Sequence, residues 1–139
     1  RLRSENSVSI HVRRGDYITN SLYSKCDEKY FRTAMNYIAK REIDSKFYVF
    51  SDDIAWAKAQ SVFSNCQVIE YDQESGSWND LFLMSCCKHN IIANSSFSWW
   101  GAWLNNNPAK KVYAPKRWFN SNVRNIDEKD VIPEAWVKV

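Results

Sequence analysis

The stretch "SIHVRRGDYI", residues 9 to 18, begins as a strand and ends as a polar loop. Its first residues belong to "SVSIHV" at 7–12, a segment typical of a strand that is buried in a sheet. Because side chains alternate along a strand, His11 and Arg13 point to one side and Arg14 points to the other. The two neighbouring arginines are therefore separated at the place where a buried strand gives way to a loop.

The same alternation of strand and helix continues along the chain. The spacing of apolar residues predicts strands at 7–12, 46–51, 66–71, 90–94 and 111–115, and helices at 27–42, 53–63, 78–89 and 96–106. Strands that alternate with helices pair in parallel through right-handed crossovers, and the helices cover both faces of the sheet. We therefore expect an α/β fold, a Rossmann-like parallel sheet. Beyond Pro115 we expect an irregular tail that packs across the domain through Trp118 and Trp136.

The composition agrees with one globular domain over residues 1–139. Of these residues 45% are hydrophobic and 25% are charged, and the length is sufficient for a single core. The net charge of +3 comes without a basic block, which argues against nucleic acid as a partner. No apolar run reaches the length of a membrane span, and no signal peptide is visible.

The cysteines and histidines show no pattern of a metal site. Cys26, Cys66, Cys86 and Cys87 have no CxxC spacing and are expected to be reduced residues of the core. His89 is expected to end a helix, where a positive charge is favoured. No nucleophile–base pair stands out either. The polar residues after the strands suit the binding of an anion better than covalent chemistry.

The arginines after the first strand are the leading candidates for a binding site, because ligands of parallel sheets bind at the carboxyl ends of the strands. One guanidinium can bind phosphate through two hydrogen bonds while the other pairs with a carboxylate such as Asp16. The alternative is a salt bridge on the surface. Arg14-Gly15-Asp16 also spells an adhesion tripeptide, but that function needs a mobile loop tip, and here the tripeptide directly follows a strand.

Carboxylates follow the second strand and begin the third helix, and each has a capping interpretation beside a ligand-binding one. Asp52 or Asp53 can cap the next helix, or can hold a ribose hydroxyl or a base edge. Asp80 can close a capping box with Ser77, or can accept the two N–H donors that guanine presents.

Two serines, Ser95 and Ser96, stand at the start of the fourth helix. Free N–H groups and the positive end of the helix dipole make such a start a phosphate cradle, although capping alone also explains the serines. The segment lacks the glycines of a Walker loop or a dinucleotide fingerprint. Four apolar residues of this helix recur at helical spacing and are expected in the core: Trp99, Trp100, Trp103 and Leu104.

Three blocks of sequence, taken together and in this order, resemble one family. These blocks are "HVRRGDY", "YVFSDD" and "NDLFLMSCCKHNIIANSSFSWWGAWL". They resemble α-1,2-fucosyltransferases of glycosyltransferase family 11 over roughly residues 7–119. The resemblance implies a two-domain GT-B enzyme that inverts the sugar, uses GDP-fucose and needs no catalytic metal. The chain would be the C-terminal, donor-binding half of a protein about twice as long.

The resemblance also implies roles for individual residues after the first strand. Arg13, together with His11, would be catalytic, because it would meet the β-phosphate of the donor and steady the leaving GDP. Arg14 and Asp16 would brace this motif. Asp80 would hold the guanine.

Further donor-binding candidates follow the later strands. Ser96 and Phe97, with Ser95 beside them, would lie at the phosphates. Asp52 and Asp53 are the remaining candidates.

The implied reaction is the transfer of fucose to a galactoside hydroxyl with an α-1,2 linkage. A galactose-terminated glycan would bind as acceptor between this domain and an N-terminal domain of the same protein, and no residue here stands out as the catalytic base. Two alternatives stay open: a GDP-sugar-binding module without catalysis, and a different donor, which is another GDP-sugar or a UDP-sugar. The absence of a signal favours a bacterial enzyme of the cytoplasm; membrane association stays open, as does the Golgi lumen for a eukaryotic enzyme.

Overall fold

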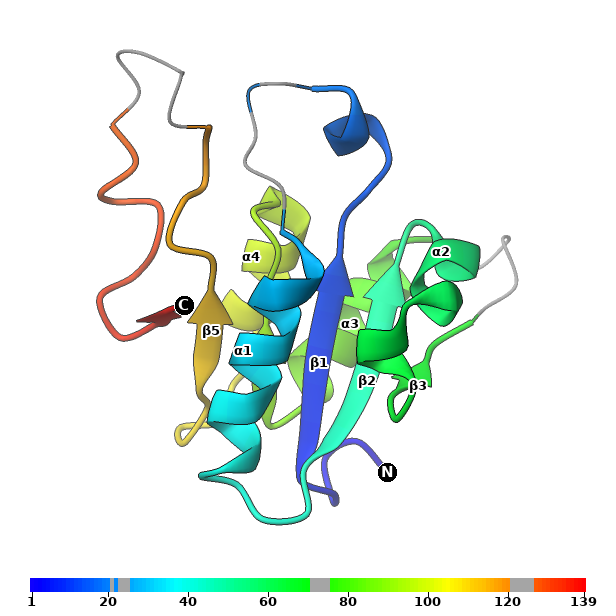
Figure 1. Ribbon diagram of the computed structural model, residues 1–139. Coiled ribbons are helices and arrows are strands. Elements are labelled where there is room, and N and C mark those ends of the chain that lie inside the picture. The colour runs from blue at the N-terminus through cyan, green and yellow to red at the C-terminus, as the bar shows by residue number, and fades with distance from the viewer. Residues whose placement is uncertain (21, 23–25, 71–75, 121–126) are drawn as a thin grey trace.

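Six parallel strands form one sheet in the order β3-β2-β1-β4-β5-β6 (Figure 1). The computed structural model describes residues 1–20, 22, 26–70, 76–120 and 127–139. The strands are β1 Ser7–Val12, β2 Lys46–Ser51, β3 Gln67–Val68, β4 His89–Ile91, β5 Val112–Ala114 and β6 Val137–Lys138. This strand order is that of a Rossmann-like sheet, in which the direction of winding reverses between β1 and β4. The predicted fold class is therefore confirmed.

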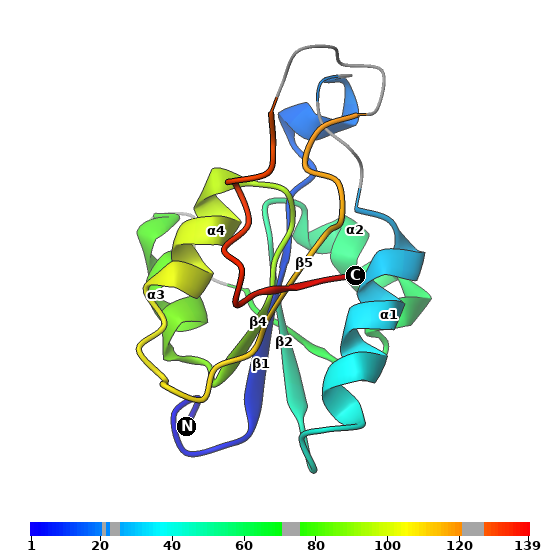
Figure 2. The same ribbon diagram turned by 90° about the vertical axis from the view of Figure 1, so that its left-hand side faces the viewer.

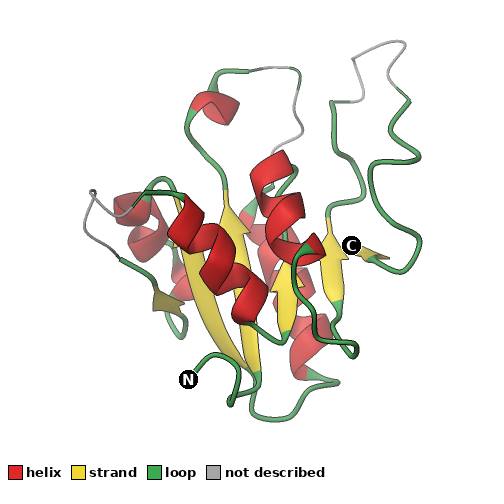
Figure 3. Cartoon of the chain, turned by 180° about the vertical axis from the view of Figure 1, so that it is seen from behind, coloured by secondary structure: helices red, strands yellow, loops and turns green. Residues whose placement is uncertain are grey.

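Helices cover both faces of the sheet (Figure 2). Helices α1 Glu28–Ala39 and α2 Ile54–Ala59 lie on one face, and α3 Trp78–Cys86 and α4 Ser96–Trp103 lie on the other. Seen from behind, α3 and α4 stand in front of the strands (Figure 3). Two short 3-10 helices complete the set, at Asp16–Ile18 and Ser61–Phe63. Within the described residues, no helix is long and apolar enough to cross a membrane.

The sheet differs from its prediction at both edges. Strand β3 has two residues where six were expected at 66–71, and Tyr71 lies outside the described residues. The tail beyond Pro115 is not wholly irregular, because it ends in a sixth strand, β6. There the N–H of Val139 donates to the carbonyl of Ala114 over 2.9 Å. A strand this short gives too few residues for a period of two to appear in the sequence.

The sequence predicted that His89 ends a helix, and this prediction is wrong. His89 begins β4. Helix α3 stops three residues earlier, at Cys86. The Nδ1 atom of His89 accepts a hydrogen bond of 3.1 Å from the N–H of Lys111, so this nitrogen carries no proton. Burial lowers the pKa of His89, although the nearby carboxylate of Glu42 opposes the shift. The residue is therefore a neutral, buried histidine at the start of a strand.

The core lies on both sides of β1 and β2, whose central positions are buried. On the α1 face, Val8 and Ile10 pack against Phe31 and Ile38. On the other face, Phe50 of β2 belongs to a cluster with residues of α3 and α4. Strands that are covered on both faces are buried along their whole length, which explains the continuous burial of β1.

The tryptophans divide between the core and the surface. Trp118 and Trp136 of the tail are buried in one cluster with Ile92, as the sequence predicted. The prediction that α4 buries its large apolar residues holds only for Trp99, which is partly buried against that cluster. The prediction is wrong for three others, which are exposed: Trp100, Trp103 and Leu104.

All four cysteines are free thiols. Cys87 is buried, and Cys26 and Cys66 are half-buried and pack against the cluster around α1. Cys86 is half-buried at the end of α3, where its sulfur lies 3.6 Å from Nη2 of Arg3. The expected role as small residues of the core is confirmed for Cys87.

A pair of buried asparagine amides joins the centre of the sheet to α3 and to the segment after α4. The Nδ2 group of Asn90 donates to Oγ of Ser9 over 2.7 Å and to the carbonyl of Met84 over 2.9 Å. Its Oδ1 atom accepts from Nδ2 of Asn105 over 2.7 Å. The same Asn105 amide donates to the carbonyl of Cys87. Since buried polar groups are costly without partners, this network fixes α3 over the sheet.

Replacing Asn90 by alanine should lower the free energy of unfolding by about 2–4 kcal/mol, because Ser9, Met84 and Asn105 each lose a buried partner. Urea unfolding followed by circular dichroism measures the change. Asn36→Ala on the exposed side of α1 is the matched control and should shift the value by less than about 0.5 kcal/mol. Equal effects of the two substitutions would contradict the role of the network.

Candidate functional site

The candidate residues gather at the carboxyl ends of β1 and β4, where the winding of the sheet reverses. These two strands are parallel neighbours, with Val8 paired to His89 and Ile10 paired to Ile91. The same register, carried forward, places Arg13 opposite Asn94, the residue before Ser95. In sheets of this order the crevice between the two reversing strands is where ligands bind.

The loop after β1 is held by the carboxylate of Asp52, the residue that follows β2. The Oδ1 atom of Asp52 accepts from the N–H of Arg14 over 2.9 Å, and its Oδ2 atom accepts from the N–H of Gly15 over 2.8 Å. A Cβ atom at Gly15 would lie 2.7 Å from that Oδ2 atom. The same oxygen lies 3.6 Å from Nη1 of Arg13. Asp52 therefore both shapes the backbone of the loop and neutralises part of the charge of Arg13.

The two arginines have different partners, in line with their alternation. Nη2 of Arg13 lies 3.1 Å from the carboxylate of Asp16. Nε of Arg14 lies 3.3 Å from Asp53, and its guanidinium stacks over the ring of Trp56 at 4.0 Å from the centroid. The carboxylate of Asp16 thus pairs with Arg13, the arginine that was expected at phosphate. The sequence did not predict the contact between Trp56 and Arg14, because the two residues are far apart in the sequence and belong to no common motif.

Asp53 acts as the cap that the sequence predicted. Its Oδ1 atom accepts from the N–H of Trp56 over 3.0 Å, at the start of α2. Its other oxygen pairs with Arg14. Both Asp52 and Asp53 are therefore occupied within the protein, and their roles toward a nucleotide stay predictions.

The tripeptide Arg14-Gly15-Asp16 lies in an exposed loop, although it follows a strand directly. The side chain of Asp16 is 66% exposed, so burial does not remove the adhesion interpretation. The contacts of the two charged residues of the tripeptide argue against the adhesion interpretation. Asp16 pairs with Arg13, and Arg14 is half-buried between Asp53 and Trp56.

His11 lies inside the protein between β1 and α4. It is 4% exposed, and its ring lies 5.3 Å from the ring of Phe97. Burial lowers the pKa of His11 to about 4, with Asp52 opposing the shift and Arg13 adding to it. Its Nδ1 atom is buried and has no hydrogen-bond partner among the described residues. At neutral pH His11 is therefore an uncharged hydrogen-bonding group beside the first turn of α4.

The backbone N–H groups at the N-terminus of α4 receive no capping hydrogen bond from the side chain of Ser95, the residue before the helix. Ser95 stands at the cap position in extended conformation, but its hydroxyl makes no capping bond. Ser96 is exposed, and Phe97 is half-buried beside His11. Orphan N–H groups at a helix start attract anions. The capping interpretation of Ser95 is thus wrong, and the anion-binding interpretation stays a prediction.

Asp80 lies in the first turn of α3 and does not form the predicted capping box. Ser77 has helical backbone angles and makes no capping bond. The Oδ1 atom of Asp80 is buried without a hydrogen-bond partner among the described residues, and burial raises the pKa of this carboxyl to about 7. Its neighbour Leu81 packs in one cluster with Phe97, which places the first turns of α3 and α4 on the same side of the sheet. An unpaired carboxyl of this kind is typical of a functional site.

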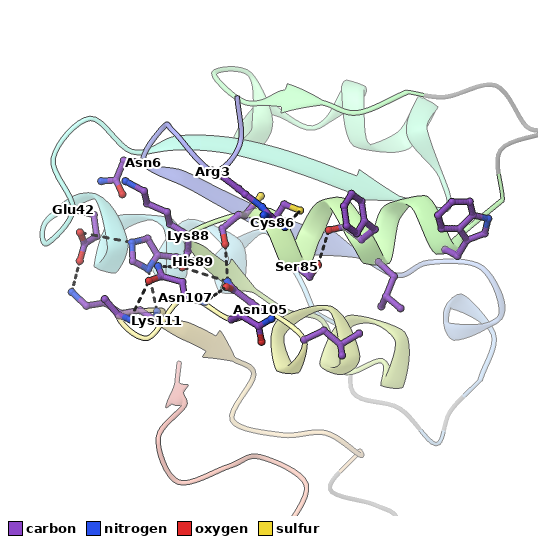
Figure 4. Close-up of a pocket in the computed structure, with 17 residues that line it drawn as sticks. Arg3, Asn6, Glu42, Ser85, Cys86, Lys88, His89, Asn105, Asn107 and Lys111 are labelled. Atoms are coloured by element: carbon purple, nitrogen blue, oxygen red, sulfur yellow. Dashed lines mark hydrogen bonds and ion pairs between the residues drawn. The ribbon is translucent and has the colours of Figure 1, made fainter.

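Of two cavities among the described residues, the smaller includes Arg13 and Arg14 in its lining, and none of the candidate residues lines the larger. One of about 290 Å³ lies at the carboxyl end of β1, and Arg13, Arg14, Trp56 and Asn94 contribute to its lining. A larger one of about 1080 Å³ extends along α3 to the beginning of β4 (Figure 4). Among the residues described, no group of three or more His, Cys, Asp or Glu side chains is arranged to hold a metal ion.

Known proteins with similar sequences identify the family. An Escherichia coli alpha-1,2-colitosyltransferase is 40% identical over 99% of the chain and 49% of its own length. The E. coli O-antigen biosynthesis glycosyltransferase WbnK is 40% identical over 96% of the chain and 45% of its own length. Human galactoside alpha-(1,2)-fucosyltransferase 1 is 32% identical over 73% of the chain and 30% of its own length. The chain thus spans about half the length of its bacterial relatives.

The model of the family described as "Glycosyl transferase family 11" matches residues 2–139. This match covers almost the whole chain and includes the arginine loop, the two aspartates after β2 and the tryptophan-rich helix α4. It confirms the resemblance that the three sequence blocks indicated. The protein belongs to glycosyl transferase family 11.

Proposed function

We propose that this chain is the donor-binding domain of an inverting glycosyltransferase that moves fucose from GDP-fucose to a galactoside hydroxyl, with an α-1,2 linkage. The observation that carries the proposal is the position of Arg13, which follows β1 at the reversal of the sheet and, in the register of β1 and β4 carried forward, lies opposite Asn94, two residues before α4. A guanidinium and a helix N-terminus both bind phosphate. The name of the human relative supports fucose as the sugar, and the names of both the human relative and the colitosyltransferase support the linkage.

The chemistry of the proposed step is the stabilisation of a leaving group. As the bond between the sugar and GDP breaks, negative charge grows on the β-phosphate. The guanidinium of Arg13, already oriented by Asp52 and Asp16, and the N–H groups of α4 are fixed donors for that charge. Donors held in place before the reaction stabilise such a charge better than water, which must reorient.

The remaining candidates have supporting roles in this proposal. The carboxylate of Asp80 would accept the paired N–H donors of guanine, which explains a buried oxygen without a partner. Neutral His11 would hold the start of α4 through Phe97 and offer a hydrogen bond toward the phosphates. The acceptor glycan and the catalytic base would be supplied outside this chain.

A second donor is favoured by one specific observation. The relative that is 40% identical over 99% of the chain is named a colitosyltransferase. If the colitosyl group is also carried by GDP, the proposed phosphate and guanine contacts serve both donors, and the choice of sugar depends on other residues. Transfer from labelled GDP-fucose, compared with the colitosyl donor, decides between them in a full-length enzyme that carries this domain. Transfer from neither donor would favour the alternative of a binding module without catalysis.

Replacing Arg13 by alanine should weaken GDP binding about tenfold to hundredfold, because a charge-assisted contact with the β-phosphate is lost. The affinity for GMP, which has no β-phosphate, should change much less. Isothermal titration of the chain with both nucleotides measures the difference. In a full-length enzyme the same substitution should lower turnover by about 10²–10³-fold.

Arg32→Ala on the exposed side of α1 is the matched control for the loss of one arginine. It should leave both nucleotide affinities unchanged. An Arg13→Ala chain that binds GDP and GMP as the native chain does would overturn the phosphate assignment.

The hydrogen bond between Asp52 and the backbone of Gly15 predicts that substitutions at these two positions have coupled effects on GDP binding. Gly15→Ala should weaken GDP binding in the native chain, because the new Cβ displaces Asp52 from the loop that carries Arg13. In an Asp52→Ala background the methyl group has space, so the second substitution should have little further effect. Titration of the four chains with GDP should give a coupling of about 0.5–3 kcal/mol.

Asp130→Ala in the exposed tail controls for the loss of one negative charge. Combined with Gly15→Ala, it should give additive effects on the affinity for GDP. Additive effects of Gly15→Ala and Asp52→Ala would show that the two residues do not act together.

The affinity for guanosine should depend on pH through Asp80. Its pKa of about 7 means that the carboxyl takes up a proton as the pH falls, and guanine needs the carboxylate form. Affinity should therefore be highest above about pH 8 and fall about tenfold per unit below about pH 6. Guanosine is the probe because it has no phosphate that titrates. NMR titration measures the affinity, and Asp80→Asn should remove the dependence on pH.

A stability measurement tests the same carboxyl without a ligand. Its pKa is raised from 3.8 to about 7, so the folded chain holds this proton more tightly than the unfolded chain does. The stability that the protonated form contributes is lost as the pH rises through about 7. Asp80→Asn should therefore raise the free energy of unfolding above pH 7. A destabilised variant at this pH would contradict the unpaired state of Asp80.

A further inference from the structure

Five large apolar side chains stand exposed on the outer side of α3 and α4, and we call this set the aromatic face. Its members are between 46% and 68% exposed: Trp78, Phe82, Trp100, Trp103 and Leu104. Trp78 and Phe82 are four residues apart on α3, so they share one side of that helix. Trp100 and Trp103 are three residues apart on α4, and Leu104 directly follows this helix, four residues after Trp100. Large exposed apolar side chains that gather on neighbouring helices often mark a surface that contacts a partner.

The aromatic face cannot turn inward, because α3 and α4 are already in close contact below it. A Cβ atom at Gly101 of α4 would lie 3.3 Å from Cβ and 2.8 Å from Cε of Met84 on α3. The inner sides of both helices are thus filled, by Met84 toward β2 and by Ala102 toward the tail. Within this chain, the exposure of the aromatic face follows from the packing of the helix pair.

A groove connects the aromatic face to a group of cations. The cavity of about 1080 Å³ is lined at α3 and α4 by Trp78, Phe82 and Leu104, and elsewhere by Arg3 and Lys88. Arg3 and Lys88 both line this cavity near Cys86, at the end of α3 (Figure 4).

The groove carries little negative charge. Glu42, the acidic residue of its lining, pairs with Lys111 and faces His89. Between Ser77 and Lys111 the sequence has three lysines and a single acidic residue, Asp80. Apolar surface and positive charge are therefore combined on one side of the molecule.

We infer that the aromatic face and its groove dock on a lipid bilayer that contains anionic phospholipids. Tryptophan side chains are preferred at the interface between headgroups and hydrocarbon, because the ring is apolar and its N–H can still bond to water or headgroups. Arg3 and Lys88 supply positive charge for the lipid phosphates, and each such cation near an anionic surface strengthens binding. Charge complementarity favours this partner over a neutral membrane.

Helices α3 and α4 form one layer over the sheet, whereas the loop that carries Arg13 follows β1 at an end of the sheet (Figures 1 and 2). Trp78 lies two residues before Asp80, so docking through the aromatic face would come close to the proposed guanine contact at the start of α3. The inference does not rest on the proposed function, because lipid binding is measured without any nucleotide.

The test is co-sedimentation of the purified chain with vesicles of phosphatidylcholine alone or mixed with phosphatidylglycerol. The chain should partition onto the mixed vesicles and much less onto the neutral ones, and added salt should release it. The double variant Trp78→Ser/Phe82→Ser should bind about tenfold more weakly, because the aromatic rings no longer enter the interface. Lys88→Gln should weaken binding about fivefold.

Two matched controls lie on the opposite helix layer. Tyr37→Ser removes an exposed aromatic ring from α1, and Lys40→Gln removes an exposed cation next to its end. Both should bind the mixed vesicles as the native chain does. Circular dichroism of each variant confirms that it is folded.

Three results would overturn the inference. The first is the absence of binding to the mixed vesicles. The second is equal binding to both kinds of vesicle. The third is dimerisation in analytical ultracentrifugation that the Trp78→Ser/Phe82→Ser variant abolishes, since a second copy of the chain would then cover the face.

Discussion

The position of α3 and α4 over the sheet depends on one buried amide, that of Asn90. A polar side chain in the middle of a parallel sheet is costly unless each of its hydrogen-bonding groups is satisfied. Asn90 meets this condition only when β1, α3 and Asn105 are all in place, since its partners come from each of them. Apolar packing alone would tolerate a sliding of these helices, whereas directional bonds do not. The first turns of α3 and α4, which carry Asp80 and Phe97, take their places from this constraint.

The candidate site uses the geometry that results. The carboxyl ends of the parallel strands lie at one edge of the sheet. Between β1 and β4 the direction of winding reverses, and the two helix layers diverge at that point. Arg14 turns toward α2 and is fully occupied by Asp53 and Trp56, while Arg13 stays at the edge. The repulsion between adjacent arginines is thus relieved by placing their carboxylate partners in different directions. Among the described residues, one buried polar atom of His11 and one of Asp80 have no hydrogen-bond partner. In the proposed function, these two atoms are available to hydrogen-bond the ligand.

The sequence was sufficient to predict the fold class and most elements, because five of the six strands alternate regularly with helices. It could not predict β6, whose two residues show no period. It misplaced His89, because a helical pattern and a short buried strand overlap in "SCCKHNII". The exposure of Trp100 and Trp103 was missed for a related reason: spacing identifies the face of a helix but not whether anything covers it. The brace formed by Asp52 joins residues nearly forty positions apart, and only the folded chain brings them together.

The contact between Gly15 and Asp52 has a consequence for how this family varies. The carboxylate occupies the volume that any side chain at position 15 would need, and the backbone N–H groups of the loop need that carboxylate. Neither residue can be exchanged alone without disturbing the loop, so the two positions are free to drift only together. A larger residue at position 15 therefore has space only where position 52 carries a side chain smaller than aspartate.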